Sequence, residues 1–339
     1  MLTKSSLSVA AMAATVVALC AVNSPASAVE LKFASFVGGG HVMNRRIFAP
    51  WTEEVAKMSG GSLTVKMYYG GALGKGGTQQ FKRAVDGVAD ITWSLQGYTA
   101  NLFRKTTLIE MAGVGDNPVD ATRRMWKAFD EHLASEYDRV KVIAIWALDA
   151  PIIHTRLKPV TKVDDLKGMK VRTPSQYQAW LIAALGATPV PMSADKMYNA
   201  IGRGVIDGIL ISPSAINNFK LNEVTKYHAA GISFGRSPFF AVMNKKAYQS
   251  LSRAHRDIID RTSGLAMSIK ASEVYTEDGI KGRNFLKADK NRTYAELPAG
   301  EIARANALLK QAEQDIIARV KKEGIDVGPA LAALKRAGK

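Results

Sequence analysis

The sequence predicts an α/β protein of two lobes, each a mostly parallel sheet flanked by helices. The clearest observation is the stretch 168–213, where short apolar strand patterns alternate with helical patterns. Such alternation indicates a parallel sheet with helices on its faces. Strands are expected over 169–171, 188–192 and 205–211, and helices over 176–185 and 194–202.

An internal repeat and the chain length are the other two observations. Phe81 and the run GVAD at 87–90 recur as Tyr198 and the run GVID at 204–207, with the same spacing. In both copies the glycine suits the end of a helix, and the apolar residues after it begin a strand. About 310 residues follow the export signal described below, which fits two domains better than one. Two lobes of one design would face each other across a cleft, and hinge closure could trap a ligand there.

The first 28 residues have the three parts of a secretory signal peptide. Lys4 precedes an apolar run over 7–22, and small residues at 26–28 form the cleavage site. We therefore expect cleavage after Ala28 and a periplasmic protein. The alternative is a lipid-modified Cys20, but the bulky Leu19 precedes it where a small residue is usual. Because Cys20 is the only cysteine, the mature chain would contain no disulfide and no thiol.

The pattern of the first lobe follows. Strands are expected over 30–37, 63–69, 89–95 and 140–148, and helices over 42–58, 79–86 and 121–134. In helix 42–58 the apolar side chains recur every three or four residues, which gives one buried face. Alternation of apolar and polar residues marks strand 63–69, and the nearly continuous apolar run 140–148 is typical of a strand buried in a parallel sheet.

The chain is expected to cross between the lobes twice, near Ala150 and again within 235–238, before a strand over 239–244. Apolar stripes then predict a long helix over 253–286 and final helices over 299–322 and 328–336. The expected organisation is a signal peptide (1–28), lobe I (29–150 with 239–290, the second part including a helix that spans both lobes), lobe II (151–238) and C-terminal helices packed on the lobes (291–339).

The chain is strongly basic, with a formal net charge of +16 from 46 Lys and Arg against 30 Asp and Glu. Such a balance raises the question of nucleic acid as a partner. The basic residues are scattered, however, and none of their runs exceeds a pair. Together with the export signal, this favours long-range attraction of anionic ligands, and we expect no nucleic-acid partner.

Arg172 is the leading candidate for an anion contact. It ends the strand at 169–171, and ligands of open α/β sheets collect at the carboxyl ends of strands. Its planar fork of donors matches a carboxylate bidentately, although an arginine in this position can also be a solvated surface residue. Further candidates at strand ends, turns and apolar positions are Phe36, His41, Trp93, Gln96, Tyr98, Trp146, His154, Pro174, Ser212, Ser214, Phe234 and Phe239, for which core packing or a plain turn is the alternative.

The sequence carries no recognisable catalytic set. None of its five histidines forms an H-E-x-x-H pair, and no G-x-S-x-G motif is present. The glycine-rich run 70–77 matches neither nucleotide-binding fingerprint. These absences favour a binding protein over an enzyme, and we expect no cofactor.

An ordered set of motifs resembles the DctP-type solute-binding proteins of TRAP transporters, the tripartite ATP-independent periplasmic carriers. It comprises LKFAS, FKRAVDGVADI, LKGMKVRTP, ALGATPVPM, AIGRGVIDGILISP, LNEVTKYH and SPFFAVMNKKAY, and spans nearly the whole mature chain. The resemblance implies a two-lobed periplasmic binding protein fold with crossing strands and a long helix across both lobes. It also implies capture of an organic acid, with Arg172 at the family's carboxylate-binding arginine, and delivery to a permease of one small and one large membrane subunit.

Three departures from the family pattern matter. Many relatives carry a second arginine near the positions of Ile152 and Ile153, so a second charged anchor is not expected here. Ser214 stands after Pro213 where similar members often have a tryptophan and then a glutamate that helps to hold a metal, so we expect no metal. Ser212 replaces the common asparagine before the proline.

One firm cation and an otherwise apolar pocket favour a monocarboxylate ligand, bulky or aromatic. Two alternatives remain at this stage. The protein could present its ligand to a sensor instead of a permease, or it could be a two-lobed enzyme.

Overall fold

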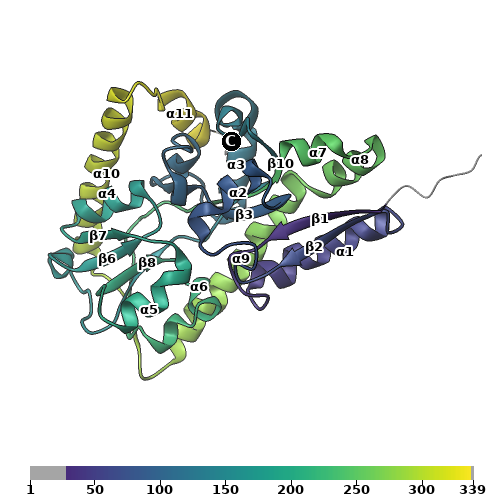
Figure 1. The fold of residues 1–339 in the computed structure, drawn as a ribbon. Helices are drawn as coiled ribbons and strands as arrows, with labels where there is room; N and C mark the ends of the chain where they lie inside the picture. Colours follow the sequence, from purple (N-terminus) through teal and green to yellow (C-terminus); the bar gives the residue numbers. More distant parts are fainter. Residues whose placement is uncertain (1–27, 337–339) are drawn as a thin grey trace, which may run out of the picture.

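The computed structural model describes residues 28–336, and the expected signal peptide lies outside them. Two mixed sheets, each covered by helices, form the two lobes (Figure 1). The lobe I sheet has the strand order β2-β1-β3-β10-β4, and the lobe II sheet has the order β11-β9-β5-β8-β6-β7. The α/β two-lobed fold class is therefore confirmed.

The strands of lobe I are β1 (Val29–Ala34), β2 (Leu63–Tyr68), β3 (Ile91–Leu95), β4 (Val140–Ala147) and β10 (Pro238–Asn244). Those of lobe II are β5 (Ile152–Thr155), β6 (Lys170–Thr173), β7 (Thr188–Pro191), β8 (Gly208–Ile211), β9 (Tyr227–Ala230) and β11 (Thr293–Glu296). The strands β1, β2 and β3 are parallel, as are β6, β7 and β8. β10 is antiparallel to β3 and β4, and β5 is antiparallel to β8 and β9, which makes both sheets mixed rather than uniformly parallel.

The helices are α1 (Ala49–Met58), α2 (Gln80–Asp86), α3 (Pro118–Lys127), α4 (Gln176–Ala184), α5 (Met197–Gly202), α6 (Ala215–Asn218), α7 (Lys245–Ser250), α8 (Arg253–Thr262), α9 (Leu265–Ala288), α10 (Ala299–Lys322) and α11 (Gly328–Arg336). The last two have the expected bounds. The single helix expected over 253–286 is wrong, because Gly264 adopts a φ of 78° between α8 and α9 and interrupts the helical backbone.

The short strand β11 was not expected, since its four residues are mostly exposed and lack an apolar pattern. It pairs in parallel with β9 and so extends the lobe II sheet. The segment after α9 therefore begins with a strand, and α10 and α11 follow it. β11 is held by backbone hydrogen bonds to the edge strand of an existing sheet, and an apolar pattern in its own sequence is not required for them.

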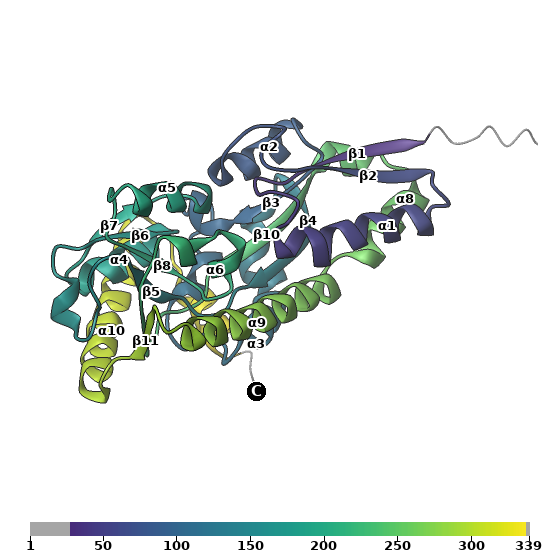
Figure 2. The same ribbon diagram turned by 90° about the horizontal axis from the view of Figure 1, so that it is seen from below.

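Three segments connect the lobes. Residues 148–151 join β4 to β5 and residues 231–237 join β9 to β10, close to the predicted crossing points. The third is α9, which runs from α8 on lobe I to β11 at the edge of lobe II (Figure 2). Gly235 lies so close to the chain at Glu110 that a Cβ would come within 2.2 Å of the Glu110 carbonyl carbon, so only glycine fits in this crossing.

The internal repeat is also present in three dimensions. Gly87 follows α2 and Gly204 follows α5, with φ angles of 73° and 72°. Asp90 then accepts a hydrogen bond from the amide of Lys32 at 2.7 Å, and Asp207 accepts one from the amide of Lys170 at 2.8 Å. The same helix-to-strand construction with the same carboxylate contact therefore occurs once in each lobe.

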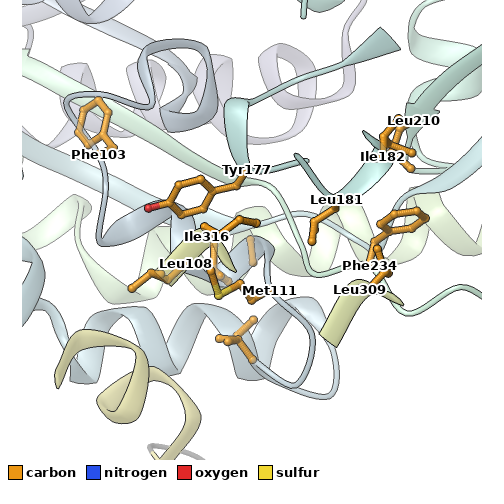
Figure 3. Close-up of a cluster of buried hydrophobic side chains, with 14 of the residues drawn as sticks. Phe103, Leu108, Met111, Tyr177, Leu181, Ile182, Leu210, Phe234, Leu309 and Ile316 are labelled. Carbon is orange, nitrogen blue, oxygen red and sulfur yellow. The ribbon is translucent and has the colours of Figure 1, made fainter. Parts of the chain in front are cut away.

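An apolar core continues from lobe I through lobe II to the C-terminal helices. Phe103 and Leu108 contribute from lobe I, Tyr177 and Leu181 from α4, and Leu309 and Ile316 from α10 (Figure 3). A second cluster, rich in aromatic side chains, fills lobe I around Phe33, Phe48 and Trp93. No helix between residues 28 and 336 combines the length and apolar character that a membrane span requires.

Candidate ligand-binding site

A cavity lies where the crossing segments meet the carboxyl ends of β3, β6 and β8. The empty space among its lining residues, including the part open to solvent, is about 560 Å³. Lobe I contributes Phe36, His41, Trp93 and Tyr98, and lobe II contributes Arg172, Pro174, Ser212 and Ser214. Phe239 closes the wall from β10. Nine of the thirteen candidates from the sequence therefore meet here.

Arg172 is almost fully buried, with 1% of its surface exposed. Its Nε donates to the carbonyl of Met192 at 2.9 Å, and its Nη1 donates to the carbonyl of Leu210 at 3.2 Å. Its Nη2 lies 3.5 Å from the Tyr98 hydroxyl. No carboxylate among residues 28–336 lies within ion-pair distance of this guanidinium. Burial lowers the pKa of Arg172, which reflects the cost of an unpaired charge away from water.

Tyr98 offers a second donor beside the arginine. Its hydroxyl oxygen accepts from the amide of Ala194 at 2.8 Å and from Arg172. Burial raises the pKa of Tyr98, so the hydroxyl keeps its proton at neutral pH. Because both contacts use the oxygen as an acceptor, the proton remains available to a ligand. Arg172 and Tyr98 together form the donor end of the cavity.

Aromatic rings form the middle of the cavity. Phe36 and Trp93 have ring centroids 5.0 Å apart, and Trp93 stacks on Phe239 at 6.0 Å. Tyr275 of α9 adds a ring 5.5 Å from Phe239. The indole Nε1 of Trp93 is already bonded to Ser35 at 2.9 Å, so the rings present apolar surface to a ligand.

His41 contributes a neutral imidazole to the same wall. Burial, reinforced by the nearby charge of Arg45, lowers the pKa of His41 to about 3. Its Nδ1 accepts from the amide of Met43 at 3.3 Å. This contact assigns the proton to Nε2, and the side chain is a donor rather than a cation.

A hydrogen-bonded chain of Ser212, Ser214 and Asp149 also lines the cavity. The two hydroxyl oxygens lie 2.7 Å apart, and Ser214 donates to Oδ1 of Asp149 at 2.7 Å. Burial raises the pKa of Asp149 to about 6, while the hydrogen bonds from Ser214 and Ser212 oppose the rise. The carboxyl group is therefore ionised at neutral pH.

Four sequence candidates do not lie on the cavity wall. The amide Nε2 of Gln96 donates to the Tyr137 hydroxyl at 2.8 Å, away from the cavity. Trp146 stacks behind Phe239 inside the aromatic core of lobe I. Phe234 packs in the core that continues under α10. A position at a strand end or in an apolar run does not determine which way a side chain points. The sequence therefore cannot separate these four residues from the candidates that line the cavity.

His154 is the fourth. Its Nε2 contacts the carbonyl of Ile211 at 3.1 Å, and its Nδ1 lies 2.8 Å from Nδ1 of His228. Burial lowers the pKa of both histidines, that of His228 to about 4. They form a neutral pair inside the lobe II sheet.

The sequence reasoning missed several polar cavity residues: Asp149, Gln178, Asn218, Ser237 and Tyr275. Asp149 and Ser237 stand in the two crossing segments, so the predicted crossings were a usable signal for them. The other three lie on helices, and only the packing of the lobes brings them to the cavity.

Asn218 joins the two lobes beside the cavity. Its Oδ1 accepts from the amide of Val42 in lobe I at 3.1 Å, and its Nδ2 donates to Asp278 of α9 at 3.1 Å. The neighbouring Phe219 packs edge-on against His41, with ring centroids 5.5 Å apart. These contacts hold α6 against lobe I.

Within residues 28–336, no group of three His, Cys, Asp or Glu side chains is placed to hold a metal ion. The polar groups of the cavity are an arginine, a tyrosine, a histidine, amides and hydroxyls, with Asp149 as its one acidic lining residue. Such a set suits the binding of an organic anion.

Comparisons with known proteins agree with this geometry. The sequence profile of the DctP family, described as bacterial extracellular solute-binding protein, family 7, matches residues 33–320. A solute-binding protein of Albidiferax ferrireducens is 26% identical over 238 residues, covering 69% of this chain and 70% of its own length. The DctP protein of Rhodobacter capsulatus, named as a C4-dicarboxylate-binding periplasmic protein, is 28% identical over 49% of this chain and 50% of its own.

Solved structures match over more of the chain. A marine metagenome TRAP solute-binding protein, described as specific for aromatic acid ligands and solved with metahydroxyphenylacetate, superposes with a TM-score of 0.86 at 31% identity, covering 91% of this chain and 98% of its own. A TRAP solute-binding protein of Rhodoferax ferrireducens, solved with copurified benzoate, gives a TM-score of 0.86 at 29% identity, covering 91% and 97%. Proteins of this family bind substrates for transport and are not enzymes. The chain therefore belongs to the DctP family, the solute-binding proteins of TRAP transporters, which bind small organic acids in the periplasm.

Proposed function

We propose that this protein captures a small aromatic monocarboxylate in the interlobe cavity and delivers it to the small and large membrane subunits of a TRAP permease. In this proposal the chain reaches the periplasm through the signal peptide at 1–28. The carboxylate of the ligand binds Arg172 and Tyr98, and its ring lies among Phe36, Trp93 and Phe239.

The observation that carries the proposal is a buried guanidinium without an acidic partner among the described residues. Three of its five N–H groups contact Met192, Leu210 and Tyr98. A buried charge is costly unless an opposite charge neutralises it. A ligand carboxylate would supply that charge and accept the remaining donors in a bidentate pair.

The aromatic walls support an aromatic ligand. Phe36, Trp93, Phe239 and Tyr275 pack on one another at ring-centroid distances of 5.0 to 6.0 Å and line the cavity with apolar aromatic surface, which suits an aromatic ring better than a flexible polyol. The two solved relatives described above carry aromatic acids according to their own descriptions. Relatives solved with sugar acids share the fold at 21% identity or less, which supports the fold but not their ligands.

Two features support a single carboxylate. The family resemblance places the second arginine of many relatives near Ile152 and Ile153, and Ile153 is buried in an apolar core. The carboxylate of Asp149 also lines the cavity. A second ligand carboxylate placed there would meet a like charge in a medium of low dielectric constant.

A thermal-shift and calorimetric screen tests the proposal. Benzoate and phenylacetate should raise Tm and show binding, whereas succinate, malate and galactonate should not. Binding by dicarboxylates or sugar acids alone would overturn the aromatic assignment. For the transport step, uptake of labelled benzoate by cells with the cognate permease should require this protein, and uptake unchanged by its deletion would refute delivery to that permease.

A further inference from the structure

We propose that Ser212, oriented by Ser214 and Asp149, is an acceptor-only site that selects ligands with a hydroxyl group distal to their carboxylate. This inference rests on the proposed function, because it assumes that the carboxylate is bound at Arg172. It assigns a specificity-determining role to three residues of the cavity wall.

The direction of the hydrogen bonds follows from the last member of the chain. An ionised carboxylate only accepts, so the proton of Ser214 points to Oδ1 of Asp149 at 2.7 Å. The hydroxyl of Ser212 then donates to Ser214 across their 2.7 Å contact or to Asp149 itself, and its proton is committed in both cases. With its proton committed, the Ser212 oxygen presents only lone pairs to the cavity. A hydroxyl or other donor on the ligand can satisfy them, and an ether or a carboxylate cannot.

The surroundings hold this order in place. Asp149, Ser212 and Ser214 are all buried, with 5% exposure or less, so water does not compete freely for their hydrogen bonds. The second oxygen of Asp149 faces α9, where a Cβ on Gly279 would lie only 2.4 Å from it. The Nη1 atom of Arg283 lies 3.9 Å from Oδ2 of Asp149, and its positive charge favours the ionised form of this carboxyl group. Asp149 therefore directs Oδ1 to the serine chain.

Ser212 lies close to Arg172 along the same strand. The Nη1 atom of Arg172 bonds to the carbonyl of Leu210, and Ser212 follows two residues later, just after β8. Two residues of extended chain span about 7 Å. A small ligand held by its carboxylate at Arg172 can therefore present a distal substituent to Ser212.

Gln178 lies in the same region and gives the site a second acceptor. Its Nε2 donates to the Ser237 hydroxyl at 3.2 Å, and its buried Oε1 has no hydrogen-bond partner among the described residues. Gln178 lines the cavity, as does Ser237. The cavity wall therefore offers acceptors at Ser212 and Gln178 as well as donors at Arg172 and Tyr98.

Calorimetry with matched ligands tests the inference. The probes are benzoate, the three hydroxybenzoates and their methyl ethers, each titrated into the purified mature protein. At least one hydroxybenzoate should bind about fivefold to tenfold more tightly than benzoate, and its methyl ether should lose that gain. Ser212→Ala should abolish the preference, so that the hydroxybenzoate and benzoate bind this variant with the same affinity. Ser233→Ala, which changes an exposed serine of a crossing segment, is the matched control and should keep the preference.

A second variant tests the charge. Asp149→Asn should raise the affinity for isophthalate relative to benzoate, because it removes the like charge that opposes a second carboxylate. Equal affinities for benzoate and all hydroxybenzoates, or a preference retained in Ser212→Ala, would overturn this inference and leave the proposed function intact. Absence of binding by every aromatic acid would instead refute the proposed function, and this inference with it.

Discussion

Arg172→Gln is the substitution that separates ligand binding from fold stability most clearly. Glutamine removes the charge and the fork while keeping an amide donor near the carbonyls of Met192 and Leu210. A hydrogen bond to a charged group contributes about 1.5–3 kcal/mol. Losing two of them to a ligand carboxylate costs about 3–6 kcal/mol, which corresponds to a rise in Kd of roughly a hundredfold to ten-thousandfold.

The ligand-free protein should respond quite differently. Removal of an unpaired buried charge lowers the desolvation cost, and this gain offsets the hydrogen bonds that are lost. We therefore expect the free energy of unfolding without ligand to change by no more than about 2 kcal/mol. Arg172→Lys keeps the charge without the planar fork and should give an intermediate loss of affinity.

Isothermal titration with benzoate measures the affinities, and urea unfolding without ligand measures the stability. Arg203→Gln, an exposed arginine of lobe II, is the control and should bind as the wild type does. Benzoate binding by Arg172→Gln within about threefold of the wild type would refute the assignment of the carboxylate to this guanidinium. A large loss of stability in the free protein would refute the argument that the charge is unpaired.

Three further predictions concern the contacts around the site. Asn218→Ala removes the hydrogen bond to Val42 across the lobes, so release of benzoate should be about fivefold faster in stopped-flow tryptophan fluorescence. Burial raises the pKa of Glu110 to about 8, above its value in the unfolded chain. The stability that protonated Glu110 contributes is therefore fully present at low pH and is lost as the pH rises through 8. Glu110→Gln should therefore match the wild type near pH 4.5 and exceed its free energy of unfolding at pH 8.5. Gly279→Ala forces a methyl group against Asp149 and should cost about 1–3 kcal/mol in urea unfolding.

Matched variants control these three experiments. Asn217→Ala changes the exposed neighbour of Asn218 and should leave the rate of benzoate release unchanged. An unaltered release rate in Asn218→Ala would contradict the role of its hydrogen bond to Val42 in holding the lobes together. Glu54→Gln, on an exposed face of α1, should differ from the wild type in free energy of unfolding by the same amount at pH 4.5 and pH 8.5. The same constant difference for Glu110→Gln would contradict the raised pKa of Glu110. Gly300→Ala, with open space around its Cβ, should be nearly neutral.

The secondary structure was largely predictable because its signals are local. The helix α10 occupies the bounds that its apolar stripe predicted, and Gly87 and Gly204 end helices as their position before an apolar run indicated. The strand β11 was not predictable, since its residues gain order only by pairing with β9. The break between α8 and α9 at Gly264 gives no signal in the apolar pattern, because the apolar stripe continues on both sides of it.

Residue chemistry and strand position by themselves predicted an anion contact for Arg172 at the end of a strand, and they indicated no catalytic set. Tertiary structure alone decided which polar groups share its cavity. Asp149 comes from a crossing segment and Tyr275 from a helix more than a hundred residues further along the chain, and they meet because three connections bring the lobes together. His154 and Trp146 show what strand position leaves open. Side chains alternate between the two faces of a strand, and this alternation is a local property. Which face becomes the cavity wall depends on the partner lobe, and these two side chains do not line it.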